Sequence, residues 1–300
     1  MDMTQNKCCR HGANLRRRRR RRRKILRSII FSCSIIAVAI FVAVGSSMIR
    51  SGDGRTNKYD VEAGNNTYDN AVIENSKISE KNKIQNEQSM LDDIMNSTQY
   101  PKQLKDLALK NEEALEFVYD YPAEHVKEHT IDLTEEASMD SVPLFVQWDK
   151  RWGYEKYSGN FFAASGCGPT TLSMVVVYLT HNRDASPIAV AKYSKEAGYS
   201  VDGSGSSWTL ISEGCRHYGV KAKTVALDES RMKAELDAGH PIVINVGPGD
   251  FTDTGHFMVI TGYDDEGFSI NDPNSIEKSG KRWLFKNISS QIRAVWSMYV

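Results

Sequence analysis

The chain has 300 residues, of which 40% are hydrophobic and 25% charged, and its 38 basic and 38 acidic side chains cancel. This length allows one or two domains, and only five cysteines exclude a disulfide scaffold. The charge is unevenly distributed: residues 1–27 carry 12 of the basic side chains and one acidic one, which leaves 26 basic and 37 acidic residues, a net charge of −11, in the remainder. This asymmetry predicts that the two ends of the chain lie in different surroundings.

Residues 28–49 are an apolar stretch without a charged side chain. At about 1.5 Å per residue, a helix of this length reaches the roughly 30 Å of a bilayer core. Arginines precede the stretch and net acidity follows it, so we expect a cytoplasmic Arg-rich tail over 1–27, a single transmembrane anchor over 28–49 and an extracytoplasmic C-terminal domain. The alternative is a cleaved signal peptide and a secreted protein, because small residues occur at 44–46.

Residues 16–23 are eight consecutive arginines, which also raises the possibility of nucleic-acid binding. The tract has no interleaved aromatic residues and no recognisable nucleic-acid-binding fold accompanies it. Beside a membrane span, orientation and contact with anionic lipid explain the tract better. We therefore expect a membrane partner and no nucleic acid.

Two segments separate the apolar stretch from the main domain. Residues 50–100 are rich in Asn, Ser, Lys, Glu and Asp, which is typical of a disordered linker. Residues 101–141 form a helical segment ahead of the domain, in which apolar residues at helical spacing predict one or two amphipathic helices over 102–119. His125 and His129 could form a metal pair, but no further ligands cluster near them, so we expect surface residues and no metal site.

Residues 142–300 contain the pattern of a folded domain of about 160 residues, enough to bury a core. Helices dominate its first half and strands its second half, which predicts an α+β fold rather than alternating βαβ units. The expected helices follow Cys167 and cover 187–193, 207–218 and 229–238. The expected strands cover 142–147, 220–225, 241–246, 256–263, 268–271 and 294–300.

Cys167 lies in the string Ser-Gly-Cys-Gly-Pro, directly before a helical run. The first turn of a helix has unpaired N–H groups and the positive end of the helix dipole, both of which favour a nucleophilic thiolate. The alternative is a buried structural cysteine. Cys215 lies within a helical pattern and is more typical of packing.

His256 and Asp272 are the candidate base and orienting group for that thiolate. His256 opens an apolar strand, and Asp272 follows the next strand, 16 residues later. A hairpin with its turn near Asp265 would bring the two side chains roughly opposite each other, so that the carboxylate could fix the imidazole tautomer. The alternative is that Asp272 only caps a turn before Pro273.

The strings SGCGPTTLSMVV, GHFMVITGYD and INDPN together resemble the C39-like cysteine peptidases, papain-like enzymes related to bacteriocin-processing peptidases that cut after a double glycine. The resemblance covers about residues 142–300. It implies a papain-like fold in which a nucleophile-bearing helix packs on an antiparallel sheet. It also implies that Cys167 is the nucleophile, His256 the general base and acid, Asp272 the orienting residue and Gln147 the oxyanion donor. The sequence itself shows no cofactor site, so we expect no cofactor.

These features together predict a membrane-anchored, extracytoplasmic cysteine peptidase that hydrolyses peptide bonds of a peptide or protein substrate through a thioester acyl-enzyme. The chain has no phosphate-binding loop of the form G-x-x-x-x-G-K-[ST] and one apolar span, so we do not expect a bacteriocin exporter. One alternative is a non-catalytic peptide- or glycan-binding module, in which His256 or Asp272 would be displaced from Cys167. Another is a cell-wall amidase or transpeptidase that uses the same three residues.

Overall fold

The computed structural model describes residues 66–300, with side chains described from residue 79 onward. The predicted tail over 1–27 and anchor over 28–49 lie outside these residues, as does the first part of the predicted linker. Within residues 66–300, no helix combines the length and the apolar character that a bilayer crossing requires. Residues 70–300 form one compact unit, so the helical segment over 101–141 and the domain over 142–300 belong to the same body.

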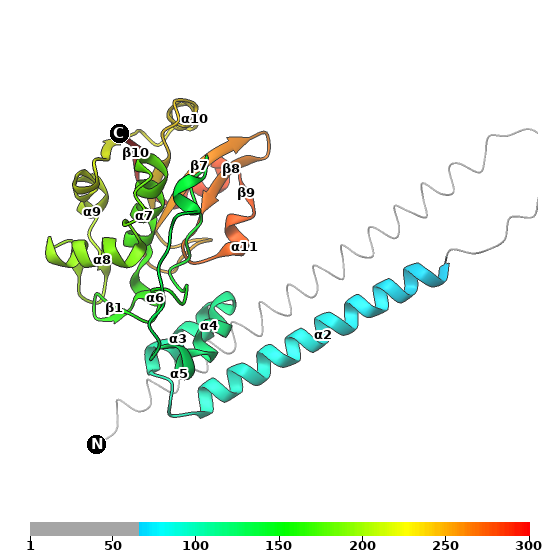
Figure 1. The fold of residues 1–300 in the computed structure, drawn as a ribbon. Coiled ribbons are helices and arrows are strands. Elements are labelled where there is room, and N and C mark those ends of the chain that lie inside the picture. Colours follow the sequence, from blue (N-terminus) through cyan, green and yellow to red (C-terminus); the bar gives the residue numbers. More distant parts are fainter. Residues whose placement is uncertain (1–65) are drawn as a thin grey trace, which may run out of the picture. The chain divides into compact units, whose positions relative to one another are not determined.

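The centre of this unit is a six-stranded antiparallel sheet with strand order β5-β10-β6-β7-β8-β9 (Figure 1). Its strands are β5 (Lys221–Thr224), β6 (Ile242–Val246), β7 (His256–Asp264), β8 (Gly267–Asn271), β9 (Arg282–Trp283) and β10 (Ile292–Tyr299). All of β6 is buried. Alternate residues of the central strands enter two different hydrophobic clusters, so both faces of the sheet are covered.

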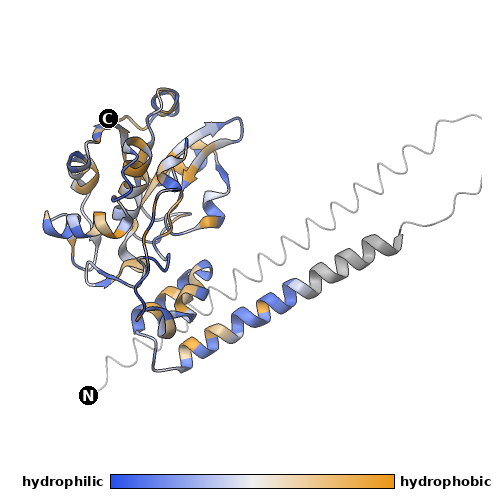
Figure 2. Ribbon diagram, in the orientation of Figure 1, coloured by the Kyte–Doolittle hydropathy of each residue, from blue (hydrophilic) through white to orange (hydrophobic). Residues whose placement is uncertain are grey.

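Helix α7 (Cys167–Thr180) packs against β7 on one face of the sheet. It is apolar on nearly all sides, as its orange colour in Figure 2 shows, and a helix of this composition must be enclosed. Helix α10 (Glu229–Asp237) covers the opposite face, where its buried Met232 joins the second cluster. The helix that begins at the candidate nucleophile, Cys167, is therefore part of the core of the domain.

Shorter elements complete the domain. The helices are α6 (Phe162–Ser165), α8 (Pro187–Glu196), α9 (Thr209–Ser212), α11 (Ile276–Ser279) and α12 (Phe285–Ile288), with 3-10 turns η4 (Gly214–Tyr218) and η5 (Ser289–Gln291). A further 3-10 turn, η3 (Glu136–Ser138), lies just ahead of the domain. Two hairpins pair β1 (Lys156–Tyr157) with β2 (Asn160–Phe161), and β3 (Ser200–Val201) with β4 (Gly205–Ser206). The mixed fold around an antiparallel sheet confirms the predicted α+β class.

The helical segment ahead of the domain contains α3 (Lys102–Lys110), η2 (Glu112–Ala114), α4 (Leu115–Tyr119) and α5 (Tyr121–Glu124), which confirms the helices predicted over 102–119. Their buried apolar residues, with Ile94, form a third hydrophobic cluster. Phe161 and Ala163 belong to the same cluster and lie on the chain just before Cys167. The segment thus packs against the part of the domain that leads into α7.

Residues 66–96 of the predicted disordered linker form helix α2 (Asn66–Asn96). Its described side chains are mostly polar, as the blue colour in Figure 2 shows, and the apolar contacts of Met90, Leu91 and Ile94 lie in its last turns. Its sequence contains no Gly or Pro to break a helix. A polar composition alone therefore did not exclude a helix whose end docks on the domain.

Two predicted elements were wrong. Residues 142–147 are an irregular segment rather than a strand, because Pro143 has no N–H to donate and the carbonyls of Val142 and Pro143 accept instead from the side-chain amide of Asn271. The predicted helix over 207–218 is split into α9 and η4. A Cβ atom on Gly214, the first residue of η4, would lie only 3.0 Å from the ring of Tyr199.

Candidate active site

Cys167 is the first residue of α7, between two glycines that allow close passage of the chain. A Cβ atom on Gly166 would lie 2.6 Å from the ring of Phe162, and one on Gly168 would lie 2.6 Å from Oγ of Ser206. Cys167 is partly exposed, whereas Cys215 is buried. Burial raises the pKa of the Cys215 thiol to about 11, so at neutral pH this residue is a packed thiol rather than a nucleophile.

His256 is the first residue of β7 and pairs with Val246 of β6. Its ring is buried, with Nε2 2.7 Å from Oδ1 of Asp272. The ring also interacts with the thiol of Cys167, since each of the two groups shifts the pKa of the other. Because Nε2 faces the carboxylate, the ring has only its Nδ1 atom left for the sulfur. The structure therefore brings Cys167, His256 and Asp272 together at one site.

The electrostatics of this chain favour a charged pair. Burial alone would raise the pKa of the Cys167 thiol, but the hydrogen bond and charge of His256, with the backbone N–H groups of Phe257 and Gly168, lower it overall. Burial opposes the charged imidazolium of His256, yet the Asp272 carboxylate and then Cys167 raise the pKa of His256 from 6.5 to about 10. Shifts in these opposite directions favour a thiolate beside an imidazolium.

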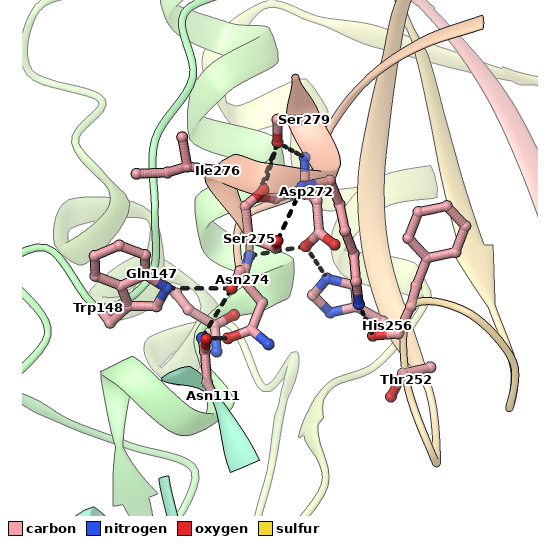
Figure 3. A network of polar contacts seen from close by, with 12 residues as sticks. Asn111, Gln147, Trp148, Thr252, His256, Asp272, Asn274, Ser275, Ile276 and Ser279 are labelled. Carbon is pink, nitrogen blue, oxygen red and sulfur yellow. Dashed lines mark hydrogen bonds and ion pairs between the residues drawn. The ribbon is translucent and has the colours of Figure 1, made fainter. Parts of the chain in front are cut away.

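Asp272 lies one residue beyond β8, in the turn that leads into α11 (Figure 3). The ladder pairs Val259 with Asn271, so the fully buried carboxylate reaches His256 from the turn rather than from a paired position. The Oδ1 atom that contacts His256 also accepts from the N–H of Asn274 at 2.8 Å. Asp272 thus both contacts the imidazole and caps its own turn, which combines the two interpretations of its sequence.

Gln147 is buried beside the same turn. Its backbone N–H donates to the carbonyl of Pro273 at 2.7 Å, and its side-chain Nε2 donates to the carbonyl of Ala163 in α6 at 2.8 Å. Its Oε1 has no hydrogen-bond partner among the described residues. The structure therefore places Gln147 between the Asp272 turn and the residues that precede Cys167. An amide nitrogen carries a second N–H, which remains after the bond to Ala163.

The histidine pair ahead of the domain makes local contacts. His125 Nδ1 lies 2.5 Å from the carbonyl of Tyr121, and His129 Nε2 lies 3.2 Å from the carbonyl of Glu124. In the part of the chain that the structure describes, no group of three or more His, Cys, Asp or Glu side chains could hold a metal ion. These two histidines therefore stay outside the chemistry of the site.

Sequence reasoning missed the groups that hold the Asp272 turn. Ser275 caps α11 by accepting from the N–H of Lys278, a role that a serine before a short helix could have indicated. Asn111 and Glu113 also contact this turn, from a part of the chain more than 160 positions away. No local pattern indicates contacts over such a distance.

Comparison with known proteins identifies the family of this chain. The sequence matches the Peptidase_C39 like family over residues 139–300, more than half of the chain, and the chain belongs to this family. Among solved structures, the chain is similar to the peptidase domain of Streptococcus ComA, a bi-functional ABC transporter involved in quorum sensing. The two sequences are 18% identical, the match covers 53% of this chain and 96% of that chain, and the TM-score is 0.39. A C39-like peptidase from Bacillus anthracis is similar with 17% identity, 53% and 95% coverage and a TM-score of 0.34. No curated protein matches the sequence.

Proposed function

We propose that the chain is a membrane-anchored, extracytoplasmic cysteine peptidase that hydrolyses peptide bonds through Cys167, His256 and Asp272. The observation that carries this function is the buried hydrogen bond between His256 and Asp272, together with the mutual pKa shifts of His256 and Cys167 at the start of α7. Membership of a C39-like peptidase family supports it. A non-catalytic binding module would be expected to have His256 or Asp272 away from Cys167, and the contacts among these residues favour catalysis instead.

The first half of the reaction forms a thioester. The thiolate of Cys167 attacks the peptide carbonyl carbon, and the electron pair of the C=O bond moves to the oxygen. The second N–H of Gln147 and the backbone N–H of Cys167, in the first turn of α7, would hold this oxyanion. His256 then gives its proton to the leaving amine as the C–N bond breaks, and Cys167 carries the acyl group.

The second half releases the acid and restores the ion pair. His256, now neutral, takes a proton from water, and the oxygen of that water attacks the thioester carbonyl. Collapse of the second tetrahedral intermediate breaks the C–S bond and regenerates the thiolate beside the imidazolium. Asp272 contacts His256 Nε2 throughout, which keeps Nδ1 directed to the sulfur and stabilises the charged ring.

The location follows from the sequence rather than from the folded unit. The apolar stretch over 28–49 and the basic tail over 1–27 favour an anchor with the domain outside, and the tail could contact anionic lipid. The substrate would then be a peptide or protein outside the membrane. Fusing reporters that are active on only one side of the membrane to Val300 tests this orientation, and activity of a cytoplasmic reporter would contradict it.

The activity is tested with the full chain and a peptide library. Product ions that appear with the wild-type chain and disappear with Cys167→Ala support the peptidase function. Cys215→Ala is the matched control, since it removes the buried thiol without touching the site, and it is expected to cleave as wild type does. Equal cleavage by wild type and Cys167→Ala, or none by either, would argue against the function.

A further inference from the structure

The turn that carries Asp272 is held by residues outside the matched peptidase region. Glu113, in η2 of the helical segment, accepts with Oε2 from the backbone N–H groups of Ile276 at 2.7 Å and Glu277 at 3.0 Å. Its other oxygen accepts from the hydroxyl of Ser275. One carboxylate therefore binds three donors at the start of α11, immediately after the Asp272 turn.

Asn111 provides a second contact from the same segment (Figure 3). Its Nδ2 donates to the backbone carbonyl of Asn274 at 2.9 Å and lies 3.1 Å from the Oδ1 of the same residue. Its own Oδ1 accepts from the N–H of Glu113 at 3.1 Å, which fixes the two contacts relative to each other. Trp148, beside Gln147, also donates to the Asn274 carbonyl, at 3.2 Å.

The contacted residues are the ones that position the Asp272 carboxylate. Asn274 donates its N–H to Oδ1, and Ser275 donates its N–H to the backbone carbonyl of Asp272 at 3.1 Å. The other carboxylate oxygen, Oδ2, is buried without a hydrogen-bond partner among the described residues. The carboxylate is therefore oriented through one oxygen, and a shift of the turn would move it relative to His256.

The helical segment is itself packed against the domain. Leu104 and Leu107 of α3 pack in the third hydrophobic cluster with Phe161 and Ala163. The carbonyl of Ala163 is the acceptor for the side chain of Gln147. The segment thus contacts the site on two sides, at the turn after β8 and at the residues that lead into Cys167.

We propose that Glu113 and Asn111 are positioning residues that hold the Asp272 turn, so that the helical segment ahead of the matched domain completes the active site. This role rests on the proposed peptidase function. Without Glu113, three donors at the start of α11 lose their acceptor and the turn gains freedom. Asp272 then supports the imidazolium of His256 less well, and less of Cys167 is thiolate at a given pH.

The test compares Glu113→Ala and Glu113→Gln with wild type in the full chain. Glu116→Gln is the matched control, because it makes the same change of charge on the exposed side of the neighbouring helix α4. The rate of alkylation of Cys167 by iodoacetamide is followed against pH, by mass spectrometry of the peptide that contains it. In Glu113→Ala we expect the midpoint of the pH dependence of Cys167 alkylation to move to higher pH. We also expect kcat/KM for a library peptide to fall about tenfold or more, since small misplacements caused by mutations far from the chemistry have effects of this size.

The outcomes separate this role from a general effect on folding. Glu113→Ala with the wild-type midpoint and activity would overturn it, and so would a lower melting temperature with an unmoved midpoint. If Glu113→Ala does not fold, the test uses Glu113→Gln instead, because glutamine has the same size as glutamate and keeps one acceptor oxygen. The wild-type alkylation midpoint and activity in Glu113→Gln would then overturn the role. If wild-type Cys167 itself titrates like a free thiol, the peptidase function fails, and the role of Glu113 fails with it.

Discussion

Replacing Asp272 with asparagine removes the charge of the carboxylate and puts an amide NH2 group in place of the buried Oδ2. Asparagine has nearly the same shape, and its side-chain oxygen can still accept from His256 Nε2 and from the N–H of Asn274, which now share Oδ1. The turn and the ring orientation should therefore survive. The substitution isolates the electrostatic support that Asp272 gives to the imidazolium.

The size of the effect follows from the 2.7 Å separation of His256 Nε2 and Asp272 Oδ1. Opposite unit charges at this distance attract by about 6 kcal/mol at an effective dielectric constant of about 20. The neutral hydrogen bond that remains keeps about 1 kcal/mol, and the lower cost of burying an uncharged partner offsets roughly 2 kcal/mol more. A net loss of about 3 kcal/mol corresponds to roughly a hundredfold.

We therefore expect Asp272→Asn to lower kcat/KM at pH 7 about a hundredfold in a chain that still folds, with a somewhat lower melting temperature because the amide NH2 group is buried without an acceptor. The alkylation midpoint of Cys167 should move to higher pH, because a less stable imidazolium lowers the pKa of His256 and weakens its support of the thiolate. Wild-type kcat/KM with an unmoved midpoint in a folded Asp272→Asn chain would refute the electrostatic role of Asp272.

Three further outcomes are expected. The wild-type activity should fall at alkaline pH as His256 loses its proton near its raised pKa of about 10. It should also fall at acid pH as Cys167 is protonated below its lowered pKa. Loss of activity with an alkaline midpoint near pH 6.5 would contradict the ion pair. Gln147→Ala should lower kcat about a hundredfold with little change in KM, and an unchanged kcat would exclude an oxyanion role. Gly267→Ala should lower the free energy of unfolding by more than about 1 kcal/mol in a denaturant titration. Residue 267 has φ of +134°, and a Cβ atom there would lie 2.6 Å from the backbone of Trp283. An unchanged midpoint of the unfolding transition would contradict this.

Local patterns predicted the elements that carry the site. The glycines and proline around Cys167 precede an apolar run, and α7 begins at Cys167 itself. The β7–β8 hairpin follows from two apolar runs separated by a polar turn, and its last pair is Asp264 with Gly267. Both features depend on residues close in sequence, so the periodicity of side chains was enough to place them.

The supports of the site depend on contacts that no local pattern contains. Glu113 reaches Ser275 across 162 positions, and only the packing of the helical segment on the domain brings them together. The strand expected over 142–147 failed for a related reason, since this segment bonds to Asn271 and to the Asp272 turn instead of to a neighbouring strand. Sequence thus predicted the reacting groups better than the groups that hold them.

The most direct test of the peptidase function is to trap the acyl-enzyme. The full chain is mixed with the best-cleaved library peptide, quenched in acid within the first turnover and measured by mass spectrometry. We predict an adduct on Cys167 with the mass of the N-terminal product less one water, absent from Cys167→Ala. Hydrolysis that proceeds while Cys167 stays unmodified, or that continues in Cys167→Ala, would contradict a thioester mechanism.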